Sequence, residues 1–179
     1  ASMGYDIPAA IGASFAIKKL KSKKKIFCVT GDGSFQFNIQ ELQTINHHNL
    51  KINFIIFNNE GYSSMKQSQK NFTNNIGLHG VDKKTGISFP DLSKIAKAYN
   101  FKYFQASNAV KLNSIFNKIN FNKNNIIEIF VDPKQGFSPK VSSKINEFGG
   151  FEVDELYNMS PKIPVSKLSN IMKLPKNLT

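Results

Sequence analysis

The chain has 179 residues, of which 40% are hydrophobic, and a formal net charge of +12 at pH 7. This length and hydrophobic content favour one folded domain with its own core and exclude an intrinsically disordered chain. No apolar run reaches the length that a bilayer-spanning helix needs. The single cysteine, Cys28, excludes an internal disulfide and favours a cytoplasmic protein.

The positive charge does not favour nucleic-acid binding. All 24 basic residues are lysines, whereas arginine is the residue preferred for bidentate contacts with phosphates and bases. The densest group of lysines, within residues 18–25, falls where a predicted helix ends, and lysines at that position stabilise the helix dipole. We therefore expect neither a nucleic acid nor a membrane among the partners of this protein.

Hydrophobic spacing predicts an alternation of helices and strands. In chain order, we expect a helix over 8–20, a strand over 26–30, a helix over 35–47, a strand over 52–57, a short helix over 63–70, a mobile loop over 71–90, a helix over 90–100, a strand over 101–105, a helix over 108–120 and a strand over 126–131. This alternation is typical of an α/β protein with three layers, in which a parallel sheet carries helices on both faces.

Two short motifs follow the first two predicted strands: GDGS at residues 31–34 and NNEG at residues 58–61. Ligands of open parallel sheets bind where the strands end, and carboxylate and amide oxygens are ligands for Mg²⁺ or Ca²⁺. The glycines allow the backbone to approach a phosphate, and Ser34 is expected to open a helix whose free N–H groups favour an anion. The pattern predicts a diphosphate held through a divalent metal.

The order and spacing of these motifs resemble the pyrophosphate-binding domain of thiamine diphosphate (ThDP) enzymes of the acetolactate synthase and pyruvate decarboxylase superfamily. Residues 2–13 are similar to that family's SMGYGLPAAIGA segment, and residues 40–44 are similar to its QEL-x-T helix. The resemblance runs from Ser2 to about Pro161. It implies a ThDP-binding fold, with residues 1–161 as the C-terminal pyrophosphate-binding domain and residues 162–179 as a tail. The N-terminal pyrimidine-binding domain and the middle domain of the family are absent from this chain.

The resemblance also implies the site residues. Asp32, the side-chain oxygen of Asn59 and the carbonyl of Gly61 would ligate Mg²⁺, while Gly33 and Ser34 would hold the diphosphate. An Asx turn or helix cap is the alternative for Asp32, and a plain core position is the alternative for a methionine expected to wedge beneath the cofactor, Met3. The full set of expected cofactor contacts is Ser2, Met3, Gly4, Gly31, Asp32, Gly33, Ser34, Asn59, Gly61, Tyr62 and Ser63.

The activity that the resemblance implies is a ThDP- and Mg²⁺-dependent lyase or transferase. Such an enzyme decarboxylates a 2-oxo acid such as pyruvate and ligates the resulting enamine to an acceptor. The glutamate that activates the cofactor lies on the family's pyrimidine-binding domain, so no catalytic residue is certain in this domain. We expect the isolated fragment to be inactive, and the full-length protein to be a homodimer or homotetramer.

The substrate preference rests on residues that follow the metal motif. Tyr62, Met65 and Ser68 are the candidates that would face the substrate. Pyruvate decarboxylases carry a catalytic glutamate where Met65 stands, and acetolactate synthases carry a tryptophan where Ser68 stands. The absence of that acid favours carboligation. A simple 2-oxo acid decarboxylase and a non-catalytic regulatory protein that keeps the fold are the alternatives.

Overall fold

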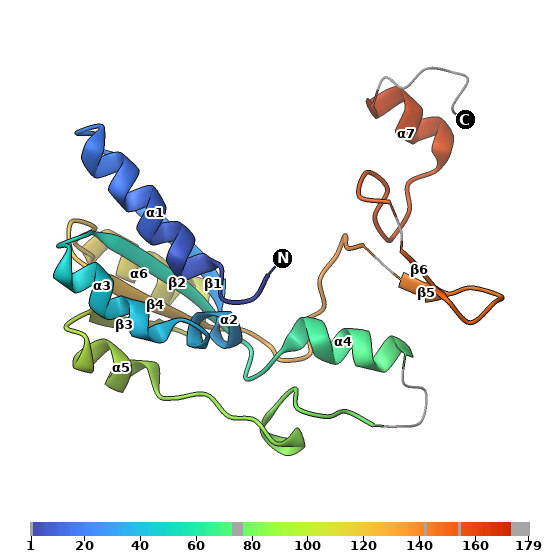
Figure 1. Cartoon of the computed structure of the whole chain (residues 1–179), viewed down its shortest axis with the longest axis horizontal. Coiled ribbons are helices and arrows are strands. Elements are labelled where there is room, and N and C mark those ends of the chain that lie inside the picture. Colours follow the sequence, from blue (N-terminus) through green and yellow to red (C-terminus); the bar gives the residue numbers. More distant parts are fainter. Residues whose placement is uncertain (1, 73–76, 142, 154, 173–179) are drawn as a thin grey trace.

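The structure, a computed structural model of the chain, describes residues 2–72, 77–141, 143–153 and 155–172. Its centre is a sheet of four parallel strands in the order β1-β2-β4-β3 (Figure 1). The strands are β1 (Ile26–Gly31), β2 (Ile52–Asn58), β3 (Lys102–Ala106) and β4 (Asn125–Phe130). The predicted parallel sheet is therefore confirmed, with each strand within one residue of its expected position.

Helices lie on both faces of this sheet, as the alternation of elements predicted (Figure 1). One face packs against α1, α2, α3 and α5, whereas α6 lies on the other face beside β3. The helices around the sheet are α1 (Asp6–Lys19), α2 (Asp32–Gln36), η1 (Ile39–Glu41), α3 (Leu42–His47), α4 (Ser63–Phe72), η2 (Lys83–Thr85), α5 (Leu92–Ala98) and α6 (Ala109–Lys118). Among the described residues, no helix is long and apolar enough to cross a membrane.

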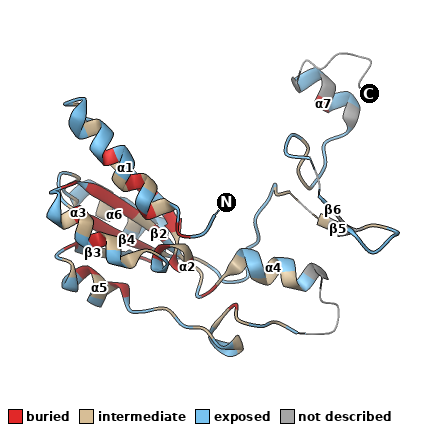
Figure 2. Ribbon diagram, viewed as in Figure 1, coloured by how far each residue is buried: buried red, intermediate tan, exposed pale blue. Residues whose placement is uncertain are grey.

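The core lies on the face of the sheet that α1, α3 and α5 cover, and Figure 2 shows buried residues gathered along the strands there. Side chains of a strand point alternately to opposite faces, so Phe54 enters this core. Its ring is fully buried between Phe35, with centroids 5.3 Å apart, and Phe101, with centroids 6.1 Å apart. On the opposite face of β1, Phe27 and Val29 are 45% and 59% exposed.

The helix predicted over 35–47 is wrong as a continuous element, because the chain breaks between α2 and α3. Asn38 leaves the helical conformation, with φ −131° and ψ 35°. Its side-chain amide donates to the Gly4 carbonyl at 2.6 Å, which ties the break to the N-terminal segment. The expectation that Ser34 opens a helix is also wrong, since α2 begins at Asp32 and has five residues.

The loop predicted over 71–90 is fastened to the end of β2 through its second half. Val81 is fully buried, its carbonyl accepts from the Tyr62 N–H at 2.8 Å, and Asp82 forms an antiparallel bridge with Gly61. A short turn of 3₁₀ helix, η2, follows, and the Asp82 side chain caps it by accepting from the Thr85 N–H. Residues 73–76 of the predicted mobile loop lie outside the described residues.

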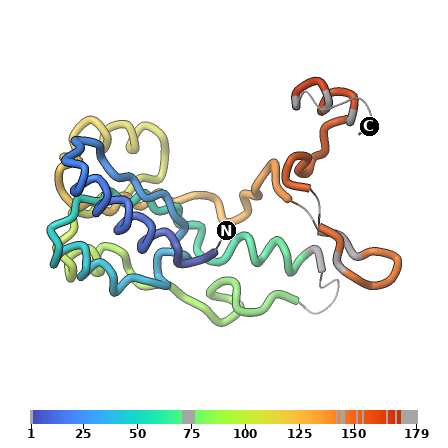
Figure 3. Tube along the Cα trace, turned by 45° about the horizontal axis from the view of Figure 1, so that its top comes forward, coloured from blue at the N-terminus to red at the C-terminus, as the bar shows by residue number. Residues whose placement is uncertain are grey.

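The C-terminal part of the chain extends away from the sheet in both views (Figures 1 and 3). It contains an antiparallel hairpin of β5 (Ser143–Ile145) and β6 (Phe151–Val153), followed by α7 (Val165–Met172). The pattern of residues from 135 onward does not predict these elements. The strands of the hairpin have three residues each, which is too short for a recognisable alternation of polar and apolar positions.

The core contact of Phe54 leads to the first prediction. Phe54→Ala removes a fully buried ring, so we expect it to lower the free energy of unfolding by about 3–5 kcal/mol. The matched control is Val29→Ala, at an exposed position on the opposite face of the same sheet, which we expect to change that free energy by less than about 1 kcal/mol. Urea denaturation of the chain, followed by circular dichroism, measures both. Equal losses would show that the core has been placed on the wrong face.

Candidate functional site

The two sequence motifs meet at the edge of the sheet where β1 and β2 end. The strands pair in register up to Gly31 and Phe57, so the chain leaves both strands at neighbouring points. Asp32 then joins the two motifs, because one of its carboxylate oxygens accepts from the Gly33 N–H at 2.9 Å and the other accepts from the Gly61 N–H at 3.3 Å. The predicted proximity of GDGS and NNEG is therefore present in the structure.

Asp32 is a buried carboxylate at the end of β1. Its residue surface is 4% exposed. Burial raises the pKa of the Asp32 carboxyl, and the backbone hydrogen bonds from Gly33 and Gly61 oppose that rise. Among the described residues, no lysine or histidine lies within ion-pair distance of it. An ionised carboxylate in such a place is stabilised by a bound cation.

Asn59 supplies a second oxygen without a partner. Its Oδ1 atom is buried and accepts no hydrogen bond from any described residue. The preceding residue differs, because Asn58 accepts from the Glu60 N–H at 2.9 Å and donates to Glu128 at 2.6 Å. A buried oxygen that lacks a donor is rare in folded proteins and indicates a missing water, ion or ligand.

The donors available at this edge suit a hard divalent cation. They are the carboxylate of Asp32, the amide oxygen of Asn59 and backbone carbonyls, and oxygen ligands of this kind bind Mg²⁺ or Ca²⁺. Among the described residues there is no group of three or more histidine, cysteine, aspartate or glutamate side chains that could hold a metal. The arrangement therefore does not resemble the nitrogen and sulfur sites that zinc prefers.

Close packing requires glycine in both motifs. A Cβ atom at Gly33 would collide with the ring of Tyr62, and a Cβ atom at Gly61 would collide with the carbonyl oxygen of Val81. The Tyr62 ring lies over Gly33 and packs edge-on against Phe89, with centroids 5.3 Å apart. The glycines thus allow a tight fit between the ends of β1 and β2 and the segment around residue 81.

The N-terminal segment joins the same site. The Gly4 N–H donates to the Ser34 hydroxyl at 2.8 Å, and Gly4 has a φ of +83°, a conformation that favours glycine. The Ser34 oxygen is thereby occupied as an acceptor, while its proton stays available to donate. Ser2 and Met3 are exposed next to this contact, and Met3 is 38% exposed. The structure therefore brings the predicted SMG segment to the GDGS motif.

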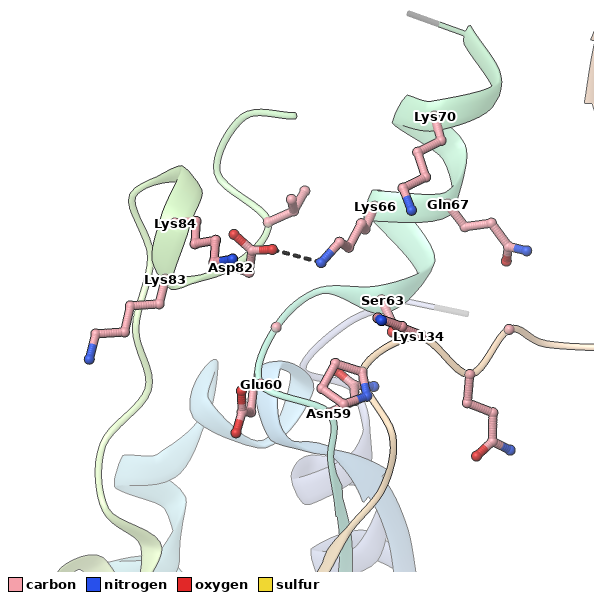
Figure 4. Close-up of a pocket in the computed structure, with 15 residues that line it drawn as sticks. Asn59, Glu60, Ser63, Lys66, Gln67, Lys70, Asp82, Lys83, Lys84 and Lys134 are labelled. Carbon is pink, nitrogen blue, oxygen red and sulfur yellow. Dashed lines mark hydrogen bonds and ion pairs between the residues drawn. The ribbon is translucent and has the colours of Figure 1, made fainter. Parts of the chain in front are cut away.

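A cleft of about 980 Å³ opens beside Asn59 and Gly61, and one face of α4 forms part of its wall (Figure 4). The α4 residues that line it are Ser63, Lys66, Gln67 and Lys70. The predicted substrate-facing residues do not line this cleft. Met65 and Ser68 are exposed elsewhere on α4, and Tyr62 packs between Phe37 and Phe89.

A buried polar network behind the site was missed by the sequence analysis. Glu128 is 5% exposed and accepts from the Asn58 amide and from the Tyr103 hydroxyl. Burial, and then the hydrogen bond to Glu128, raises the pKa of Tyr103. The signal in the sequence was the single acid inside the apolar run IIEIF at residues 126–130, which forms a central strand. The network holds Asn58, the neighbour of Asn59.

Comparison with known proteins identifies the family of this chain. The family described as thiamine pyrophosphate enzyme, C-terminal TPP binding domain, matches residues 1–128; TPP is another name for ThDP. The acetolactate synthase large subunit of Pyropia yezoensis is 35% identical over 113 residues, which are 63% of this chain and 18% of that protein. A probable acetolactate synthase large subunit of Methanococcus aeolicus is 31% identical over 138 residues, 76% of this chain and 22% of that protein.

A relative with a different name also matches: the 3D-(3,5/4)-trihydroxycyclohexane-1,2-dione hydrolase of Listeria monocytogenes, 32% identical over 134 residues, 74% of this chain and 20% of that protein. The chain thus spans about a fifth of the length of these relatives. Among solved structures, benzoylformate decarboxylase from Polynucleobacter necessarius has a TM-score of 0.65 and 22% identity over 75% of this chain and 24% of that chain, which shows the shared fold. The family match covers most of the chain, and the chain therefore belongs to the C-terminal, thiamine pyrophosphate-binding domains of thiamine pyrophosphate enzymes.

Proposed function

We propose that this chain is the C-terminal domain of a longer ThDP- and Mg²⁺-dependent enzyme that decarboxylates a 2-oxo acid such as pyruvate and joins the remaining acyl unit to an acceptor. The observation that carries this proposal is the unpartnered, buried Oδ1 atom of Asn59 next to the buried carboxylate of Asp32. The names of the acetolactate synthase relatives support the reaction class. In this proposal residues 1–161 form the domain, residues 162–179 form a tail, and other domains lie elsewhere in the enzyme.

The metal would be held by Asp32, by the amide oxygen of Asn59 and by the carbonyl of Gly61. The buried charge of Asp32 and the unsatisfied oxygen of Asn59 fit a divalent cation, which removes the penalty of burying both. Water and two diphosphate oxygens would complete the coordination, because Mg²⁺ prefers six oxygen ligands. A metal at this position would explain why, within the described residues, Asp32 accepts from backbone N–H groups without a cationic partner and the Oδ1 atom of Asn59 accepts no hydrogen bond.

The diphosphate would lie beside Gly31, Gly33 and Ser34, where the Ser34 proton is free to donate. The other expected cofactor contacts would come from Ser2, Met3, Gly4, Tyr62 and Ser63. When bound, ThDP supplies the means to stabilise the negative charge that departing carbon dioxide leaves on the substrate.

The proposed reaction breaks one carbon–carbon bond and forms another. The bond between C1 and C2 of the 2-oxo acid breaks and releases carbon dioxide. A new carbon–carbon bond forms between C2 and the carbonyl carbon of the acceptor, whose oxygen takes up a proton. No acid lies in α4, where Met65 stands at the position of the decarboxylase glutamate. The lack of a carboxylic acid there favours transfer to an acceptor over protonation, and therefore a carboligase.

Product analysis of the full-length protein with pyruvate tests this proposal. We expect ThDP binding that depends on Mg²⁺, release of carbon dioxide and a carboligation product. Acetaldehyde as the sole product would indicate that the protein is a simple decarboxylase and not a carboligase. Failure of the full-length protein to bind ThDP in the presence of Mg²⁺ would contradict the enzyme proposal and favour a regulatory protein that keeps the fold.

Asp32→Asn separates the role of the carboxylate in metal binding from its effect on folding. Because burial raises the pKa of Asp32, the ionised form opposes folding at neutral pH, and this penalty disappears as the pH falls through that pKa. We expect the variant to lose Mg²⁺-dependent ThDP binding, while the metal-free protein keeps its free energy of unfolding or gains about 1 kcal/mol at pH 7. Calorimetric titration and urea denaturation measure the two effects. Loss of stability together with normal ThDP binding would show that Asp32 is a structural cap.

Glu128→Gln tests whether the network behind the site positions the metal loop. One carboxylate oxygen becomes an NH2 donor, so the side chain can no longer accept from both Asn58 and Tyr103. We expect the free energy of unfolding to fall by about 1–3 kcal/mol, and the Mg²⁺ concentration for half-maximal ThDP binding to rise by about tenfold. Saturating Mg²⁺ should restore turnover.

Gln105→Ala is the matched control for that variant, since it removes the 3.2 Å contact at the exposed side of the Tyr103 hydroxyl and leaves Glu128 intact. We expect it to leave the Mg²⁺ dependence unchanged. If Glu128→Gln and the wild type need the same Mg²⁺ concentration for half-maximal ThDP binding, Glu128 has only a structural role.

A further inference from the structure

The connections that lead into the four strands carry positive charge without compensation. Ten of the 24 lysines of the chain, and none of its 12 acidic residues, lie within residues 18–25, 49–52, 99–102 and 118–125. These connections lie at the edge where the parallel strands begin, opposite the edge where the two motifs meet. A helix C-terminus carries only about half a negative elementary charge. Most of the positive charge at this edge is therefore left uncompensated.

A second cleft, of about 490 Å³, opens at this edge between the end of α1 and the starts of β1 and β2. Its apolar lining is Ile17, Ile26 and Leu50, and no acidic residue is among the described residues that line it. Its chemistry therefore suits an apolar group that is flanked by negative charge. Five exposed lysines also line it: Lys18, Lys23, Lys24, Lys25 and Lys51.

Hydrogen bonds hold the parts of this second cleft together. The Lys18 ammonium donates to the His48 carbonyl at 3.1 Å, which joins the end of α1 to the segment before β2. Lys25 donates to the side-chain oxygen of Asn122, in the segment before β4. Both acceptors are neutral, and among the described residues no ion pair includes a lysine of this cleft. The cleft is thus a formed site that keeps its positive charge.

The C-terminal hairpin presents the complementary chemistry. Residues 145–161 contain four of the 12 acidic residues of the chain and no lysine. At the tip of the hairpin, between β5 and β6, Phe148 is 95% exposed, and its neighbour Glu147 is exposed as well. Aromatic side chains are enriched at the centres of protein interfaces. The tip therefore offers an apolar anchor beside a negative charge.

The tip is a defined turn. The Asn146 side-chain oxygen accepts from the Phe148 N–H at 3.1 Å and from the Gly150 N–H at 2.8 Å. The Asn146 N–H donates to the Gly150 carbonyl at 2.8 Å, and Gly149 has a φ of +79°, a conformation that favours glycine. A turn that is already formed loses little conformational entropy when its side chains bind a partner.

The hairpin and the second cleft lie on opposite sides of the molecule. The C-terminal part leaves the sheet after β4 and extends away from it, whereas the end of α1 lies on the far side of the sheet (Figures 1 and 3). In this structure the tip therefore does not reach the cleft of its own chain. The cleft of a second copy is the complementary surface that is open to it.

We infer that the hairpin tip of one copy of this chain docks in the second cleft of another copy. Phe148 would pack against Ile17 and Ile26, and Glu147 would lie among the lysines. Because each copy has both a tip and a cleft, two copies can exchange tips about a two-fold axis, which doubles the contact. This contact goes beyond the proposed reaction and does not depend on it.

The lining of the second cleft favours a polypeptide over other anionic partners. None of the described residues that line it is aromatic, whereas sites for single-stranded nucleic acid stack bases on aromatic side chains. Its lysines also lack the planar fork with which arginine binds phosphate. A membrane surface is too flat to reach an apolar lining inside a cleft.

Two variants of the full-length protein test this contact when they are mixed. Phe148→Ala removes the anchor and keeps the cleft, whereas Lys23→Glu/Lys24→Glu reverses charge in the cleft and keeps the tip. We expect each variant alone to associate about tenfold more weakly than the wild type, because its copies cannot form the contact with one another. An equimolar mixture should recover part of the association, since each mixed pair retains one intact tip and one intact cleft. Sedimentation velocity measures all of these.

Matched controls separate the contact from general effects of the substitutions. Phe137→Ala removes an exposed phenylalanine outside the hairpin, and Lys94→Glu/Lys111→Glu reverses two exposed lysines in the first turns of α5 and α6. We expect neither control to change the association. Sodium chloride should weaken the association of the wild type, because salt screens the contact between Glu147 and the lysines.

Three outcomes would overturn the inference. They are association of either variant equal to that of the wild type, equal losses in the variants and their controls, and a mixture that associates no more strongly than the two variants alone. The last outcome would assign the tip and the cleft to different partners. Failure of the proposed reaction is distinguishable from these, because it would appear as a protein that does not bind ThDP or turn over pyruvate while its association still depends on Phe148.

Discussion

The site depends on one buried carboxylate that two loops share. Asp32 accepts N–H groups from its own loop and from Gly61, 29 residues later, and so fixes the end of β1 against the end of β2. Backbone N–H groups carry only partial charges, and burial raises the pKa of this carboxyl despite them. The protein thus holds the loops together with a group whose charge is incompletely compensated, and a divalent cation is the partner that would compensate it.

A second buried acid shows that this lack of compensation is local. Glu128 lies on the central strand β4 and is almost as buried as Asp32, yet it accepts hydrogen bonds from both Asn58 and Tyr103. In the described structure, protein groups alone donate the hydrogen bonds that Glu128 accepts. Beside Asp32, by contrast, the Oδ1 atom of Asn59 has no donor. In the described part of the chain, no other buried side-chain oxygen lacks a hydrogen bond, so this atom marks a place for a ligand rather than a general defect of packing.

Much of this arrangement could be predicted from the sequence, because its causes are local. Alternating apolar runs fix the strands to within a residue, and motifs that follow two neighbouring parallel strands must meet at one edge. The break at Asn38 could not be predicted, since it depends on a hydrogen bond to Gly4, 34 residues away. The cleft beside Asn59 could not be predicted for the same reason, because its lining comes from α4, η2 and the segment after β4, which meet only after distant parts of the chain have packed. The family resemblance drew attention to Met65 and Ser68, which are exposed on α4 and do not line the cleft.

Gly61 links the metal loop to one wall of the cleft beside Asn59. Its N–H donates to Asp32 and the residue bridges Asp82, so it ties the carboxylate to the wall that carries Lys83 and Lys84. A cation that holds Asp32 against Gly61 would therefore also hold this wall in place, and a ligand that contacts the wall would in turn order Gly61. Coupling of this kind is reciprocal in free energy. The short segment from Asn59 to Tyr62 would therefore favour binding of the cation and of such a ligand together.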